Sequence, residues 1–299
     1  MKIKLKKDII ESKNLDNDAI MSYVGIVSSH IYGMDETLTN KDMINFCLTK
    51  QHNASKRFEE NIRNGIKQLL KTNTIICKDK IGINYYLDNN NIILEDNDKF
   101  IFVDLEDINK IMNSGSQSKS SVLRLYLCML GTFIGKNHIK DIREPDKYNN
   151  VLGMMSQDYL AEIAHISKSS VVEYIKELER LEIVYVSRCA FKFKDKSGRI
   201  KRHNNIYGKH QNRHLINEFA DVRYQMYDDL HKIHNMSAIN NARSLMQKYN
   251  CLRNGVTYDG DTIAAIYNYV IEYNEKNPKK CRDMSVFNRY GYKEGEINE

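Results

Sequence analysis

Residues 154–188 read MMSQDYLAEIAHISKSSVVEYIKELERLEIVYVSR, and their apolar side chains follow two different periods. Ser156 is a favourable N-cap for a short helix, because a serine hydroxyl accepts a hydrogen bond from the N–H groups of the first turn. Apolar residues then recur at the spacing of one helix face, at Leu160, Ile163 and Ala164. We expect a tight turn at residues 165–166 to end this helix.

A second helix is predicted to begin after Ser167, its N-cap. Its apolar positions have helical spacing and comprise Val171, Ile175, Leu178 and Leu181. From residue 183 to residue 186 the pattern is β-rich instead, which predicts a strand. Two short helices joined by a tight turn form a helix-turn-helix, and a strand pair directly after the second helix makes it a winged helix.

In this order of elements, residues 154–207 resemble the winged-helix superfamily of DNA-binding proteins, most closely its bacterial regulators and replication proteins. The resemblance implies that the second helix presents its first turns to base edges in a major groove. Its N-terminus also favours a nearby phosphate. The candidate DNA-contacting residues on this helix are Ser167, Lys168, Ser169, Ser170, Val172, Glu173 and Lys176. Winged helices also serve in protein contacts, so a solvated or protein-binding face is the alternative interpretation.

Positive charge is concentrated immediately after this motif, in a predicted wing at residues 188–213. This segment holds nine basic residues and one acid, a net charge of +8, whereas the whole chain carries +6. The sequence DKSG at 195–198 is typical of a turn, so the wing is predicted to be a hairpin. Such a local basic stripe favours phosphate contact. The candidate phosphate-contacting residues are Arg188, Lys192, Lys194, Lys196, Arg199, Lys201 and Arg202.

The same order of elements recurs in the first third of the chain. Helices are predicted from Asp16 to Val27, from Thr39 to Leu48 and from Ser55 to Lys71, followed by β-type runs at 74–77, 81–87, 92–94 and 100–103. Aligning Ile66 with Ile175 places Ile75 on Val184, which indicates a tandem repeat. Lys56, Arg57 and Asn61 are the exposed candidates of a second recognition helix. The poorly basic hairpin behind it favours the alternative of a packing or dimerisation copy.

We therefore predict a mainly α protein with small β-hairpins (α+β), built from two tandem winged-helix units and a C-terminal helical extension. The expected boundaries are an N-terminal unit at 1–113, a linker at 114–119 with the sequence SGSQS at 114–118, and a DNA-binding unit at 120–214 that begins with a helix from Ser121 to Phe133. A helical extension at 215–276 and a loosely ordered tail at 277–299 follow.

Bulk composition indicates a soluble globular protein. The 299 residues are 41% apolar and 28% charged, with a slightly basic isoelectric point near 8.8. The six cysteines are widely spaced, which excludes a zinc ribbon or a CxxC redox pair. No apolar run has the length of a membrane span and no leader pattern is present, so we expect a cytoplasmic protein without membrane association.

Three patterns that suggest enzymatic or metal chemistry fail on inspection. The run from Gly131 to Lys136 is one residue short of a phosphate-binding loop. The sequence HQNRH at 210–214 is similar to the His-x-x-Arg box of tyrosine recombinases, but it follows a winged helix rather than an upstream helical domain. The histidine pairs 210/214 and 231/234 have no obvious third ligand. We expect no enzyme activity, no cofactor and no metal.

The tandem arrangement with a helical extension is similar to theta-type plasmid replication initiators and phage replisome organisers. This resemblance implies sequence-specific binding to double-stranded DNA and contact with host replication proteins. A winged-helix transcriptional repressor is the first alternative, and a protein-interaction scaffold is the second. The C-terminal helices could pack on the second unit, form a homodimer or bind a partner.

Overall fold

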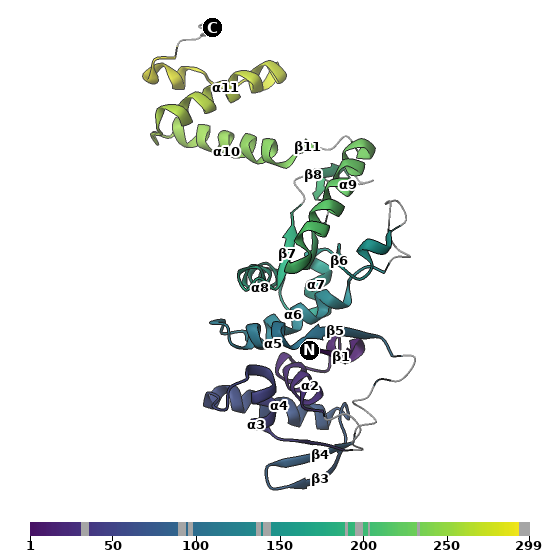
Figure 1. The fold of residues 1–299 in the computed structure, drawn as a ribbon. Coiled ribbons are helices and arrows are strands. Elements are labelled where there is room, and N and C mark those ends of the chain that lie inside the picture. Colours follow the sequence, from purple (N-terminus) through teal and green to yellow (C-terminus); the bar gives the residue numbers. More distant parts are fainter. Residues whose placement is uncertain are drawn as a thin grey trace. The chain divides into compact units, whose positions relative to one another are not determined.

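The structure is a computed structural model that describes residues 1–30, 36–88, 94, 98–135, 139, 145–188, 191–194, 200–202, 204–231 and 234–292. It is a mixed α+β structure, about 59% helical with small antiparallel sheets, which agrees with the α+β class predicted from the sequence. The chain divides into two compact units (Figure 1): residues 1–189 with 204–223, and residues 190–203 with 224–299.

The first unit begins with a strand pair, which is followed by a set of three helices and a small three-stranded sheet. Strand β1 (Lys2–Lys6) pairs antiparallel with β5 (Phe100–Asp104), and the short helix α1 (Lys7–Ile10) follows β1. The N-terminal set then comprises α2 (Asn17–Ser29), β2 (Glu36–Thr39), α3 (Lys41–Thr49), α4 (Lys56–Lys71), β3 (Cys77–Ile81) and β4 (Asn84–Asp88). Its three strands lie in the order β2-β4-β3.

A second set in the same unit repeats this order. It comprises α6 (Lys119–Gly131), β6 (Leu152–Gly153), α7 (Gln157–Ala164), α8 (Lys168–Arg180), β7 (Val184–Ser187) and β10 (Ile206–Lys209). Its strands lie in the order β6-β10-β7, so in both sets the strand between the first two helices pairs with the last strand of the hairpin. Helix α5 (Leu105–Met112) connects the sets, and the 3-10 turns Pro145–Tyr148 and His210–Asn212 lie within the second set and after it.

Local capping follows the sequence closely. Asp16 and Ser55 accept hydrogen bonds from the first turns of α2 and α4, and Ser156 and Ser167 do the same for α7 and α8. The prediction for α3 was wrong by one residue. Its N-cap is Asn40, whose side chain accepts from the N–H groups of residues 42 and 43, because Thr39 is the last residue of strand β2.

The two sets share one hydrophobic core, which differs from the predicted separation at 114–119. A continuous cluster of buried residues extends from Ile3 to Tyr207, and Arg124 of α6 donates hydrogen bonds to the carbonyls of Ser12 (2.6 Å) and Leu15 (2.7 Å), just before α2. The residues predicted to be a linker form a short turn instead. Ser114 is buried, and the Lys119 ammonium donates to the Met112 carbonyl at 2.8 Å.

The segment between β7 and β10 contains a further hairpin, as predicted for the wing. Strands β8 (Phe191–Lys194) and β9 (Ile200–Arg202) pair antiparallel, and β11 (His234–Asn235) pairs with β8. The predicted turn residues 195–199 lie outside the described residues, as do 92–93 of another predicted strand. Helix α9 (Arg213–His231) follows, and its first turns belong to the first unit, where Ile216 and Phe219 are buried.

The C-terminal helices form a small core of their own. Helices α10 (Met236–Arg253) and α11 (Gly260–Lys276) pack together, and the Asp259 side chain caps α11 by accepting from the Thr262 N–H. Residues 277–292 differ from the predicted loosely ordered tail, whose last residues, 293–299, lie outside the described part of the chain. Short 3-10 helices at Pro278–Lys280 and Ser285–Tyr290 follow α11, and Phe287 is fully buried against Tyr249 and Tyr267 because the tail supplies the aromatic residues that close this core.

Candidate nucleic-acid interface

Helix α8 keeps one face in the core of the first unit and the other in solvent. Val171, Ile175 and Leu178 are buried, as predicted, so the rotation of the helix about its axis is fixed. Lys168, Glu173 and Lys176 are exposed on the opposite side. Ser167, Ser169 and Val172 are exposed as well, and Ser170 is half-buried. The structure therefore brings all seven predicted residues to one end or one outer face of α8.

The first turn of α8 is organised by serine hydroxyls. Ser167 accepts from the Ser170 N–H at 3.1 Å, and its hydroxyl lies 2.8 Å from the hydroxyls of Ser169 and Ser170. The left-handed conformation of His165 (φ 54°) ends α7 and turns the chain into this cap. A helix N-terminus with exposed serine hydroxyls and a nearby lysine is suited to a phosphate oxygen.

The two lysines of this face differ in their surroundings. Lys168 pairs with Asp158 of α7, with 2.7 Å between the ammonium and the carboxylate, but both side chains are more than half exposed. An exposed ion pair of this kind contributes only about 0–1 kcal/mol to stability, so a competing phosphate can displace the carboxylate readily. Lys176 has no ion-pair partner among the residues described.

The far end of α8 is neutralised. Glu177 pairs with Arg180 at 2.7 Å, and Glu179 pairs with Arg188, whose pKa rises above its ordinary value because it is hydrogen-bonded to that carboxylate. Arg188 was predicted to contact phosphate from the wing. In the structure its guanidinium pairs with Glu179 of the helix it follows, and the Arg188 side chain stays 56% exposed.

Four of the remaining wing candidates lie in strands β8 and β9. Lys192 is opposite Arg202, and Lys194 is opposite Ile200, with Lys201 between them along β9. Lys196 and Arg199 lie outside the described residues. The hairpin belongs to the second compact unit by its contacts, although it is inserted between two strands of the first.

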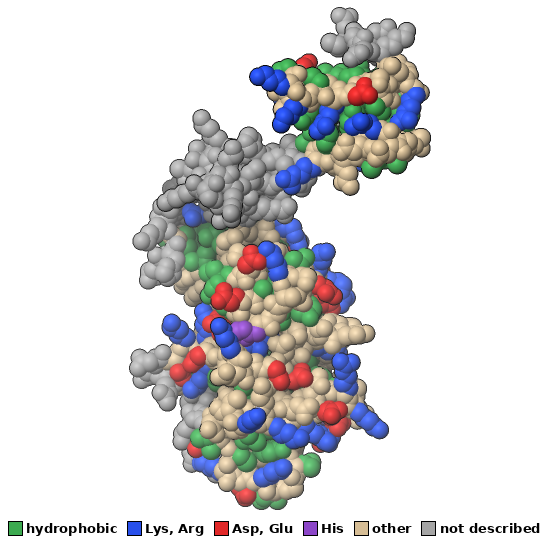
Figure 2. All heavy atoms as spheres, turned by 180° about the vertical axis from the view of Figure 1, so that it is seen from behind, with side chains coloured by type: hydrophobic (Ala, Val, Ile, Leu, Met, Phe, Trp, Pro, Cys, Tyr) green, Lys and Arg blue, Asp and Glu red, His purple; other side chains and the backbone are tan. Residues whose placement is uncertain are grey.

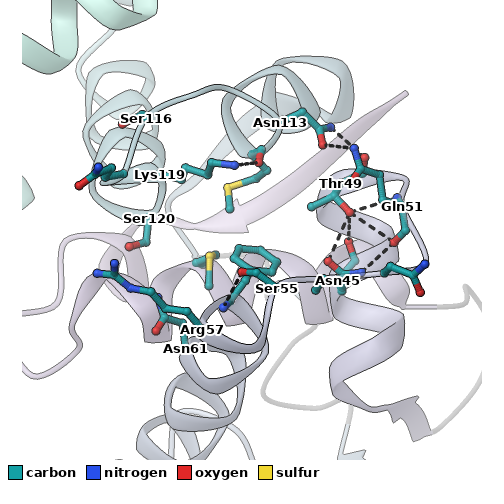
Figure 3. A pocket seen from close by; sticks show the side chains of 16 residues that line it. Asn45, Thr49, Gln51, Ser55, Arg57, Asn61, Asn113, Ser116, Lys119 and Ser120 are labelled. Carbon is teal, nitrogen blue, oxygen red and sulfur yellow. Dashed lines mark hydrogen bonds between the residues drawn. The ribbon is translucent and has the colours of Figure 1, made fainter.

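Two of the candidates on α4, Arg57 and Asn61, border a polar cavity of about 510 Å³. Lys56 and Arg57 are exposed and Asn61 is half-buried at the start of this helix. Figure 3 shows Arg57 and Asn61 on one side of the cavity and Ser116, Lys119 and Ser120 on the other. Arg57 has no hydrogen-bonded or ion-paired partner among the described residues.

The opposite wall of this cavity is held by side-chain amides. The Gln51 amide donates to Asn113 at 2.9 Å, Asn113 donates to the Thr49 carbonyl at 2.8 Å, and Asn45 donates to the Gln51 carbonyl at 2.7 Å (Figure 3). No local sequence pattern indicates this wall, because Asn113 lies far along the chain from α3 and α4. The cavity can accept a polar or anionic group, with Arg57 supplying the charge.

Charges on the surface are unevenly distributed. In Figure 2, basic and acidic side chains are interspersed over the first unit, whereas Lys and Arg side chains gather across the small C-terminal unit. Residues 242–292 contain eight basic and five acidic residues. No group of three potential metal ligands occurs among the residues that the structure describes, and none of the described helices is long and apolar enough to cross a membrane. Comparison with models of protein families, with curated proteins and with solved structures yields no match.

Proposed function

We propose that the chain is a sequence-specific double-stranded DNA-binding protein with two winged-helix units, the N-terminal and second sets described above. The repeated strand order, in which the strand between the first two helices joins the hairpin, supports this assignment. In such a unit the third helix is the recognition helix, which is α4 in the first set and α8 in the second.

The outer face of α8 carries the proposal. Its inner residues are buried in the core, and its exposed residues combine serine hydroxyls, Lys168 and Lys176 with one acid, Glu173. Serine and lysine side chains at the start of a helix can donate to guanine and to phosphate, and a glutamate can accept from cytosine. The basic β8–β9 hairpin supplies cations for sequence-independent contacts along the backbone.

Within this class, a replication initiator or replisome organiser of a plasmid or phage-like element is the proposed role. The shared core holds both candidate recognition helices within one unit, and this supports simultaneous reading of two segments of one site. At the repeated sites of a replication origin, the two helices would each bind one segment of DNA. The C-terminal unit, with its separate core, is the proposed contact for a second copy or for host replication proteins.

Selection of bound fragments from the source genome, followed by footprinting, tests this proposal. An initiator protects tandem repeats in an AT-rich origin and melts DNA beside them, whereas a repressor protects one palindrome over a promoter. Failure to enrich any fragment, together with no salt-dependent binding to DNA, would overturn the DNA-binding function itself.

Paired variants test the roles of helix and hairpin. Lys194→Ala with Lys196→Ala should weaken binding to every sequence and reduce the slope of log K against log salt, by about 0.9 for each lost phosphate contact. Lys168→Ala with Ser169→Ala should change which sequence is preferred. Lys110→Ala removes an exposed lysine of α5 and serves as the control. Identical behaviour of the two pairs would contradict the assigned roles.

A further inference from the structure

The outer face of the β1–β5 sheet combines aromatic and cationic side chains. Phe100 and Phe102 are 42% and 52% exposed, which is unusual for large apolar residues on a sheet whose other face is in the core. Their rings are 5.2 Å apart and nearly perpendicular. Lys4, directly opposite Phe102 in the strand pairing, has its ammonium 5.0 Å and 5.4 Å from the two ring centroids.

The buried face of the same two strands fixes the position of these rings. Ile3 and Leu5 of β1 and Ile101 and Val103 of β5 are all buried, and β5 packs on α6. Side chains alternate between the two faces of a strand, so the phenylalanines cannot turn inward without displacing this core. Figure 1 shows the two strands side by side. The sheet is therefore a rigid support that presents two aromatic rings to solvent.

The net charge of this face is positive. Lys2 and Lys4 are exposed and have no carboxylate partner among the described residues. Asp104 and Asp107 bind the Lys209 ammonium, Glu106 pairs with Lys110 at 3.2 Å, and Asp98 pairs with Lys6 at 2.9 Å. Glu182 lines a cavity together with Lys2 but forms no ion pair with it. A ligand for this face therefore needs a flat apolar surface for the rings and negative charge for the lysines.

We propose that the face formed by Lys2, Lys4, Phe100 and Phe102 binds single-stranded DNA, a separate activity from duplex binding by α8. Exposed rings on a sheet stack with bases, and neighbouring lysines bind the phosphates of the same strand. A duplex hides its base faces within its own stack, so only unpaired bases can use these rings. A protein partner fits less well, because lysine is depleted at protein interfaces.

A single introduced tryptophan gives a direct test, because the chain contains none. In Phe102→Trp, a short single-stranded dT oligomer should quench the indole fluorescence in a saturable manner, since stacking brings a base onto the ring. In the control Phe46→Trp, at another exposed phenylalanine on α3, the same oligomer should leave the fluorescence unchanged. Any purification tag should be at the C-terminus, because Lys2 is next to the N-terminus.

Affinity measurements with the full chain complete the test. Phe100→Ala with Phe102→Ala should weaken binding of the dT oligomer by at least about 5-fold for each ring, and Lys4→Gln should lower the salt slope by about 0.7. In these phenylalanine and Lys4 variants the affinity for duplex DNA should change little. Lys176→Ala should do the opposite, weakening duplex binding without changing the affinity for the dT oligomer. Equal oligomer affinity of wild type and the double phenylalanine variant would overturn the proposal. Quenching that depends on protein concentration alone would also overturn it, because the face would then join two copies of the chain.

Discussion

Arg124 shows how one residue can join the two sets of helices. It is 1% exposed, yet it contacts carbonyl oxygens rather than a carboxylate, holding the turn before α2 from within α6. We expect Arg124→Met to lower the free energy of unfolding by about 2–4 kcal/mol, because the carbonyls of Ser12 and Leu15 lose their charged donor and stay buried. Urea denaturation followed by circular dichroism measures this change.

The matched control keeps the charge at this position. Arg124→Lys retains a cation but lacks the planar fork that reaches both carbonyls. Its free energy of unfolding should therefore lie between those of the wild type and the methionine variant. Arg124→Met as stable as wild type would show that the guanidinium contributes no net stability. Neither substitution touches α8, so DNA binding by folded protein should persist.

Cys128 supplies a prediction about reactivity. Burial raises the pKa of its thiol to about 12, and its Sγ donates to the Ile163 carbonyl at 3.6 Å. The raised pKa keeps the thiol protonated at pH 8, and only the thiolate reacts with alkylating reagents. In native protein, iodoacetamide should therefore modify the exposed Cys281 and leave Cys128 intact, as read by mass spectrometry. Unfolding in guanidinium should abolish the difference in alkylation rate between the two cysteines. Equal rates of modification in the native protein would contradict the buried position of Cys128.

At the scale of elements, the sequence predicts those features that depend only on residues close along the chain, such as the starts of helices. A serine or aspartate cap acts on N–H groups two or three positions away, so the starts of α4, α7 and α8 were predictable. Strands β2 and β6 were missed, because each is short and is recognised only by its pairing with a hairpin strand far along the chain. The same omission shifted the predicted cap of α3 from Asn40 to Thr39.

The crossing of α2 and α4 depends on a glycine within a helix. A Cβ atom added to Gly65 would lie 2.4 Å from the Asp18 carbonyl oxygen, which belongs to the backbone and cannot move aside. We expect Gly65→Ala to destabilise the first unit by about 1–3 kcal/mol through overpacking, despite the better helix propensity of alanine. Gly115→Ala is the control, since a Cβ there meets nothing within 4 Å. The denaturation midpoints of the two variants measure this difference. A Gly65→Ala variant more stable than wild type would show that α2 and α4 can move apart without losing packing energy.

At the scale of the molecule, composition misplaced the boundaries between domains. The serine- and glycine-containing sequence at 114–118 is typical of linkers, but buried Ser114 and the contact of Lys119 with Met112 make it a turn inside one unit. The tail looked polar because its apolar residues are few, yet Phe287 and Tyr292 are the ones that meet Tyr267. Such contacts join residues distant in sequence, and no local pattern records them.

Two separate cores predict two unfolding transitions. The first unit has the continuous cluster from Ile3 to Tyr207, and the C-terminal unit has its own around Tyr249, Tyr267 and Phe287. The smaller core should melt first, because a short chain buries a smaller fraction of its surface. Phe287→Ala should lower only the earlier transition in calorimetry, by removing a buried aromatic worth about 3–5 kcal/mol, while Arg124→Met lowers only the later one. A single transition shifted by both variants would show that the units unfold as one cooperative body.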